Sequence, residues 1–134
     1  MDEQKINACR ALASMFAASG EVSAEEAAYV WRTAADLGLD EGAFRLIAEA
    51  LETKLELETM LSMITDANIR RFFFRRFVAA TLIDRQLSAA EKSMVDRVVA
   101  AFGWDTADAT AYVEHMQGFI EYERKGEALL AKLS

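Results

Sequence analysis

A helix-start pattern occurs twice in this chain at a constant distance. Residues 23–26 read SAEE and residues 88–91 read SAAE, so both copies have the Ser-x-x-Glu spacing of a capping box. The same offset of 65 residues separates LGLD at 37–40 from FGWD at 102–105, with no gap between the two frames. Glycine and aspartate in these tetrapeptides are typical of a helix end followed by a new helix start. The pattern therefore predicts a duplicated helical unit, with repeats at about 6–65 and 71–130.

Apolar residues between these signals keep helical spacing along the whole chain. Examples are the stripes at Leu12 and Phe16, at Phe44 and Ile47, and at Phe73 and Phe77. The chain has no proline, 53% hydrophobic residues and no strand-type alternation. We expect an all-α fold: a compact bundle of about seven helices built from two pseudo-twofold-related repeats, forming a single domain over residues 1–134. The stretch after Asp105 is compatible with one long helix or two, because Gly118 and Gly126 each weaken a helix.

Charge and composition narrow the classes of function. A net charge of −7 opposes the clustered positive charge that nucleic-acid binding needs, so no nucleic acid is expected. No segment has about 18 uncharged apolar residues, and the start lacks a signal-peptide pattern, so we expect no transmembrane segment and a cytoplasmic location. The single cysteine, Cys9, has helical apolar neighbours and is interpreted as a packing residue. Trp31 and Trp104 are likewise expected to pack beside helix ends.

The segment RRFFFRRF at residues 70–77 has the most unusual local composition. Helical spacing places most of its phenylalanines toward the core and stacks Arg71 and Arg75 on another face. Phe72 and Arg76 are predicted on the side opposite Val78. Two interpretations stay open: a core helix with solvated arginines, or a partner-binding surface at Arg71, Phe72, Arg75 and Arg76 that meets an acidic protein segment or an anionic lipid surface.

The repeated turn also resembles that of a known family. SGEVSAEE and DRQLSAAE are similar to the D-G-x-[VLI]-x-x-x-E turn of the tellurite-resistance TerB-like family, and the resemblance covers most of the chain. The first copy has Ser19 in place of the acid, and the second has Arg85 in place of the glycine. The resemblance implies a bundle of about seven helices that acts in bacterial stress responses, with divalent-cation binding and protein or membrane-associated partners proposed for the family.

The acidic turns are candidate metal ligands. If the two hairpins meet at one end of the bundle, their carboxylates offer the hard oxygen ligands that Ca²⁺ or Mg²⁺ prefers. These carboxylates belong to Asp84, Glu91, Glu26 and Glu21. Glu26 and Glu91 also have a purely structural interpretation, as capping-box partners.

We therefore expect a non-enzymatic, cytoplasmic stress-response adaptor of the tellurite-resistance type. It is expected to bind a partner protein or a membrane-proximal complex, with a weak Ca²⁺ or Mg²⁺ site and no other cofactor. One alternative is a metal-dependent accessory enzyme that uses the acidic turns. Another is a nucleic-acid binder that uses Arg70, Arg71, Arg75 and Arg76.

Overall fold

The computed structural model describes residues 2–18, 20–53, 55–82 and 88–133. These residues form seven α-helices and no strand, which confirms the predicted all-α class. The helices are α1 (Glu3–Ala18), α2 (Ala24–Asp36), α3 (Glu41–Glu52), α4 (Leu57–Ser62), α5 (Ala67–Leu82), α6 (Ala89–Phe102) and α7 (Thr106–Ala131).

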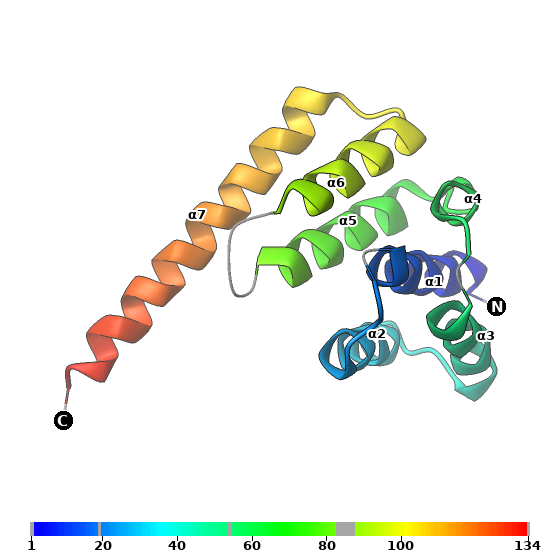
Figure 1. The fold of residues 1–134 in the computed structure, drawn as a ribbon, viewed down its shortest axis with the longest axis horizontal. Coiled ribbons are helices and arrows are strands. Elements are labelled where there is room, and N and C mark those ends of the chain that lie inside the picture. Colours follow the sequence, from blue (N-terminus) through cyan, green and yellow to red (C-terminus); the bar gives the residue numbers. More distant parts are fainter. Residues whose placement is uncertain (1, 19, 54, 83–87, 134) are drawn as a thin grey trace.

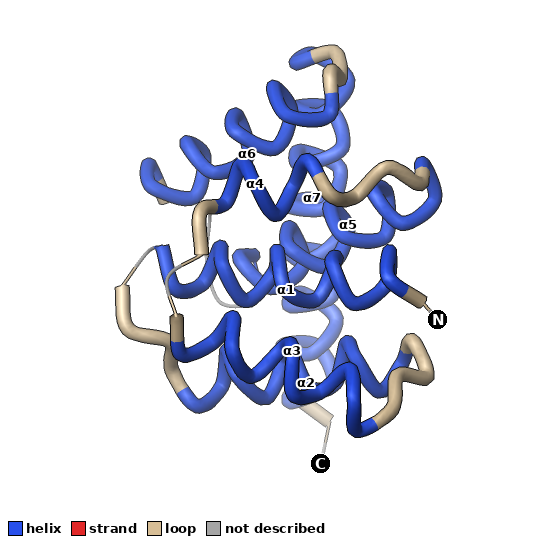
Figure 2. Tube along the Cα trace, turned by 90° about the vertical axis from the view of Figure 1, so that its right-hand side faces the viewer, coloured by secondary structure: helices blue, strands red, loops and turns tan. Residues whose placement is uncertain are grey.

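Helix α1 is the centre of the bundle. It contacts α2, α3, α4 and α5, and Figure 2 shows it between the α2–α3 layer and α4. This position fits its composition, because α1 is buried on nearly all sides and is rich in alanine, which lets neighbouring helices approach closely. The second half of the chain forms a more open group, in which α7 packs along α5 and α6 (Figure 1).

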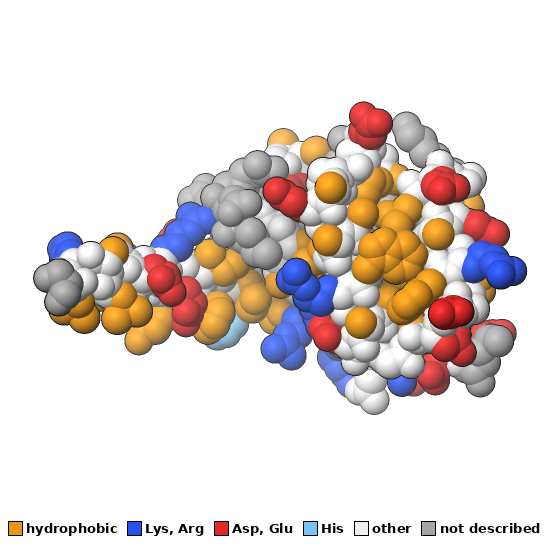
Figure 3. All heavy atoms as spheres, turned by 90° about the horizontal axis from the view of Figure 1, so that it is seen from below, with side chains coloured by type: hydrophobic (Ala, Val, Ile, Leu, Met, Phe, Trp, Pro, Cys, Tyr) orange, Lys and Arg blue, Asp and Glu red, His pale blue; other side chains and the backbone are white. Residues whose placement is uncertain are grey.

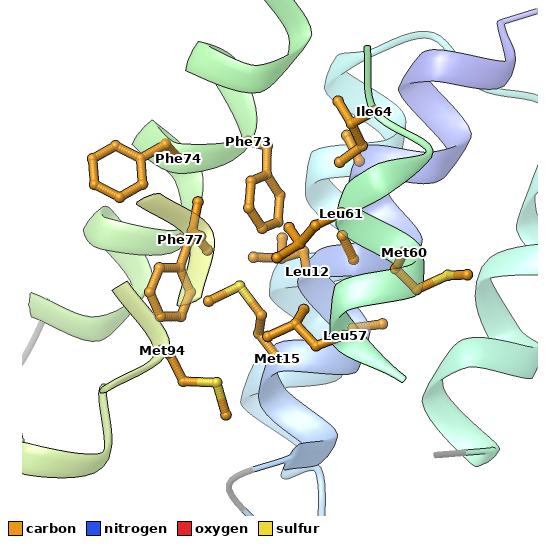
Figure 4. Close-up of a cluster of buried hydrophobic side chains, with 14 of the residues drawn as sticks. Leu12, Met15, Leu57, Met60, Leu61, Ile64, Phe73, Phe74, Phe77 and Met94 are labelled. Carbon is orange, nitrogen blue, oxygen red and sulfur yellow. The ribbon is translucent and has the colours of Figure 1, made fainter. Parts of the chain in front are cut away.

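The hydrophobic core draws side chains from all seven helices. Its centre lies where α1, α4 and α5 meet, and Figure 4 shows Leu12 and Met15 of α1 facing Leu61 of α4 and Phe73 of α5. Phe73 and Leu12 are each 1% exposed. Fully burying a side chain of this size is worth about 1.5 to 3 kcal/mol relative to exposure, so this junction contributes strongly to stability.

Both predicted capping boxes are present. The Ser23 hydroxyl accepts a hydrogen bond from the Glu26 backbone N–H at 3.1 Å, and the Glu26 carboxylate accepts one from the Ser23 N–H at 3.0 Å. The second copy repeats this arrangement at Ser88 and Glu91, with distances of 3.2 and 2.9 Å. Helices α2 and α6 therefore begin 65 residues apart, as α3 and α7 do. The pseudo-twofold relation between the complete units stays a prediction.

The two halves differ after their third helix. Helix α3 ends at Glu52, where Thr53 takes an extended conformation with φ −108° and ψ 131°, and the chain turns back to form α4. Helix α7 instead continues without interruption through Gly118 and Gly126 to Ala131. The stretch that the sequence left open is thus one helix of 26 residues, and its C-terminal half projects away from the other helices (Figure 1).

Candidate binding groove between α5 and α7

A groove with a volume of about 480 Å³ lies between α5 and the N-terminal half of α7. This volume is in the range of small-molecule and peptide side-chain pockets. The groove combines an aromatic floor with arginine side chains at its rim. Its lining residues are Ala67, Arg70, Arg71, Phe74, Arg75, Trp104, Asp105, Asp108, Ala109 and Tyr112.

The floor is held in place by contacts between aromatic rings, two of them edge-on and the Phe74–Tyr112 contact tilted by 44°. The ring of Phe74 lies 5.3 Å from that of Trp104 and 5.7 Å from that of Tyr112, and Trp104 in turn packs 5.0 Å from Phe102. Pairs of this kind contribute about 0.5 to 1.5 kcal/mol beyond the area that they bury. Phe74 is buried, whereas Trp104 and Tyr112 stay half-exposed, so the floor is rigid but accessible to a ligand.

Two of the three rim arginines are oriented by the protein itself. The Arg70 Nε donates a hydrogen bond to the Ile64 carbonyl oxygen at 2.7 Å, and its guanidinium lies 4.7 Å from the centre of the Phe102 ring. Arg71 donates a hydrogen bond to the side chain of Asn68. Arg75 lies one helical turn beyond Arg71 and is exposed. The rim is thus a row of positive charge in which the Arg70 guanidinium is held in a fixed position.

The acidic residues of the groove do not cancel this charge. The Asp105 carboxylate caps α7 by accepting hydrogen bonds from the backbone N–H groups of Ala107 and Asp108, at 2.8 and 3.2 Å. The side chain of Asp108 remains on the far wall from the arginines, one turn into α7. Three guanidinium groups therefore face two carboxylates, one of which already serves as the N-cap, so the groove favours an anionic ligand.

The pKa of the Tyr112 hydroxyl is shifted by the surroundings of this residue at the groove. Burial raises the pKa of the Tyr112 hydroxyl, and the positive charge of Arg75 opposes that shift. The hydroxyl is therefore protonated at neutral pH and is available as a hydrogen-bond donor beside Arg75. A carboxylate entering the groove would meet this hydroxyl together with the rim charge.

The predicted partner-binding residues divide between two sides of α5. Arg71 and Arg75 line the groove. Arg76 faces α2, where it forms an ion pair with Asp36 and lies over the rings of Tyr29 and Phe72, at 5.9 and 5.4 Å. Phe72 is half-buried on that same side. The structure therefore does not bring the four predicted residues together as one surface.

The predicted metal ligands are also separated by their roles. Glu26 and Glu91 accept capping hydrogen bonds, and Glu21 is exposed in the loop before α2. Asp84 lies outside the described residues. Within the ranges that the structure describes, no three His, Cys, Asp or Glu side chains are close enough to hold a metal ion. Metal binding at the turns stays a prediction.

Cys9 and His115 both lie outside the groove. Cys9 is fully buried, and this burial raises the pKa of its thiol to about 12. The thiolate that a nucleophilic cysteine needs is therefore scarce at neutral pH. His115 is exposed on α7 and does not line the groove.

The groove could not be predicted from the sequence, because its walls are two helices, α5 and α7, that are distant in the chain. From the sequence, Trp104 and most phenylalanines of residues 70–77, Phe74 among them, are expected only to pack in the core. The available signal was the position of Trp104 directly before the cap residue Asp105, since an aromatic side chain at a helix start lies at the edge of the core rather than inside it.

No family model matches this sequence, and no curated protein or solved structure matches it either. The assignment of the protein to the all-α class therefore rests on its structure alone. The resemblance to TerB-like proteins stays a prediction. Among the described residues, no helix is both long enough and apolar enough to cross a lipid bilayer.

Proposed function

We propose that this protein is a non-enzymatic adaptor that binds an acidic segment of a partner protein in the groove between α5 and α7. The observation that carries the proposal is the combination of a half-exposed aromatic floor and a rim of three arginines. Such a site suits a peptide that places one apolar or aromatic side chain on Trp104 and a neighbouring carboxylate on Arg71 or Arg75. The adaptor role in a tellurite-type stress response is supported by the sequence resemblance.

The chemistry of the groove supports binding rather than catalysis. Its lining residues, all in the described part of the chain, include no serine, cysteine, histidine or lysine that could act as a nucleophile. Its one carboxylate that does not cap a helix, Asp108, has no second acid beside it with which to divide general acid and base roles. These residues can recognise charge and shape, which is what an adaptor requires.

A displayed library of short random peptides tests the proposal. We expect enrichment of sequences in which an aromatic or leucine residue is flanked by aspartate or glutamate. Binding of the enriched peptides should fall at least tenfold, about 1.4 kcal/mol, in Arg71→Glu/Arg75→Glu. The matched control is Arg32→Glu/Arg45→Glu, which makes the same charge change at exposed arginines outside the groove. Equal loss in both variants, or no enrichment, would contradict the proposal.

Trp104 provides an independent readout. The chain has two tryptophans, so Trp31→Phe leaves Trp104 as the single reporter in the groove. An enriched peptide should shift its emission and protect it from a soluble quencher. Retention on heparin that is lost in Arg71→Glu/Arg75→Glu, without peptide enrichment, would instead favour the nucleic-acid alternative.

A further inference from the structure

The C-terminal half of α7 has an exposed apolar stripe whose side chains lie outside the hydrophobic core of the described chain. Figure 3 shows hydrophobic side chains gathered along one side of this projecting end, with acidic and basic side chains beside them. Their exposed fractions lie between 53% and 74%, whereas apolar residues in the first half of α7, such as Val113, are buried. The stripe consists of Phe119, Tyr122, Leu129, Leu130 and Leu133.

The stripe has the spacing of a helix-pairing seam. Residues 119, 122, 126, 129 and 133 follow one another at alternating steps of three and four, which is the a/d pattern of a heptad repeat. At about 100° per residue, they share one side of the helix with Leu130, roughly a third of a turn from the face that packs on α5 and α6. A helix pairing there would leave the existing packing of α7 unchanged.

Gly126 lies in the middle of this seam. A Cβ atom built on it would meet no atom within 4 Å, so nothing inside the chain requires a glycine at this position. Its lack of a side chain does allow a second helix to approach closely between Tyr122 and Leu129.

The area of the stripe suits an interface between two copies. Five large apolar side chains that are each more than half exposed present on the order of 500 to 600 Å² per copy. Two copies that covered the whole stripe would bury about 1,000 to 1,200 Å², which lies at the lower limit for a specific interface.

The charges beside the seam select the direction of pairing. Glu123 and Glu127 lie on one flank, and Lys125 and Lys132 lie on the other together with Glu121. In a parallel pair the acidic flank of one helix faces the basic flank of its partner, whereas an antiparallel pair would place like charges together. The acidic flank also disfavours an anionic lipid surface as the occupant, because such surfaces select helices flanked by lysine and arginine.

We infer that residues 119–133 form a dimerisation helix that pairs in parallel with the same segment of a second copy of this chain. The seam explains why the far half of α7 keeps large apolar side chains on one side although none of them belongs to the hydrophobic core.

Sedimentation of the full chain over a range of concentrations tests the inference. The natural protein should change from monomer to dimer as its concentration rises. Tyr122→Glu/Leu129→Glu should remain monomeric, and Ala128→Glu/Ala131→Glu, which places the same charges outside the seam, should still dimerise. A natural protein that stays monomeric, or equal behaviour of the two variants, would overturn the inference. Circular dichroism checks that all variants retain the same helix content.

The direction of pairing has its own tests. In a Cys9→Ala background, Leu133→Cys should form a disulfide between copies, because parallel pairing places these ends side by side. Lys125→Glu/Lys132→Glu should weaken the dimer about tenfold, and adding Glu123→Lys/Glu127→Lys should restore it. Failure to cross-link, or failure of the charge swap to restore the dimer, would contradict parallel pairing.

A third experiment tests whether the stripe binds a lipid surface instead of a second copy. Co-sedimentation of the natural protein with vesicles of phosphatidylcholine and phosphatidylserine should leave it in the supernatant. Vesicle binding that is lost in Tyr122→Glu/Leu129→Glu, with no dimer in solution, would overturn the inference in favour of a membrane-binding helix. Because peptide binding is measured at the groove, these outcomes are distinguishable from failure of the adaptor proposal.

Discussion

Arg75 and Arg76 are consecutive in the sequence but have different surroundings. Arg75 is exposed at the groove, whereas Arg76 is held by an ion pair to Asp36 and by the rings of Tyr29 and Phe72. A helix turns by about 100° between neighbouring residues, which moves one guanidinium toward α7 and the next toward α2. The sequence predicted that Arg76 and Phe72 share a side. It could not show that α2 covers that side, since the contact joins residues 40 positions apart.

Arg76→Ala should therefore destabilise the fold more than Arg75→Ala. Removing Arg76 eliminates a partly buried ion pair and two cation–π contacts, and we expect a loss of about 1 to 2 kcal/mol in the free energy of unfolding. Arg75→Ala should change it by less than about 0.5 kcal/mol. Urea unfolding of both variants measures the difference. Equal effects would mean that the contacts to α2 contribute little.

Cys9 should make stability depend on pH in the alkaline range. Burial raises the pKa of its thiol from 9.0 to about 12, so the folded state keeps its proton where the unfolded state loses it. This contribution is fully present below pH 9 and is lost as pH rises toward 12, at up to about 1.4 kcal/mol per pH unit. Unfolding free energies between pH 9 and pH 12 should decline more steeply for the natural protein than for Cys9→Ala. Parallel declines would contradict the assignment.

Local signals for helix starts were predictable from the sequence, whereas the end of α7 was not. The Ser-x-x-Glu pattern specifies a hydrogen-bond geometry within four residues, so Ser23 and Ser88 could be assigned as caps without knowledge of the fold. Gly118 and Gly126 each disfavour a helix by about 1 kcal/mol, but neither is followed by a new cap or a proline. The helix therefore continues, and propensity alone could not decide between continuation and a break.

Ser23→Ala and Ser88→Ala should each cost about 1 kcal/mol of stability, because each leaves a backbone N–H at a helix start without its acceptor. The two losses should add, since the caps share no partner. Ser93→Ala, at an exposed position within α6, is the control and should be neutral or slightly stabilising. Chemical denaturation of the three single variants and the double variant at Ser23 and Ser88 provides the measurement.

At the scale of the whole molecule, α7 divides into a half that belongs to the core and a half that does not. Ala109 and Val113 are buried against the bundle, and Ile120 is the last apolar residue to pack on it. The sequence predicts helical spacing of apolar residues here, and leaves open whether the stretch after Asp105 forms one helix or two. It could not reveal the groove, because Phe74 and Trp104 come together only when α5 and α7 pack side by side.

Removing residues 121–134 should leave the bundle intact. At low concentration, the free energy of unfolding should change by less than about 0.5 kcal/mol, as is usual for exposed side chains. A thermal melt of the shortened chain checks this result. Its midpoint should also be independent of concentration, whereas that of the natural protein should rise as the concentration rises. A loss of several kcal/mol would show that the projecting half stabilises the bundle directly.

Because a single unbroken helix forms one wall of the groove and also carries the seam, no flexible linker separates them. The distance along α7 from Ala109 to Gly126 is about 25 Å at 1.5 Å per residue. A parallel pair of copies would therefore hold its two grooves at a fixed distance from each other. A partner that repeats its acidic segment at the matching interval would gain avidity of about 10²- to 10⁴-fold, while one with another interval would gain none. The rigidity of α7 would then favour partners whose acidic segments are separated by the distance between the two grooves.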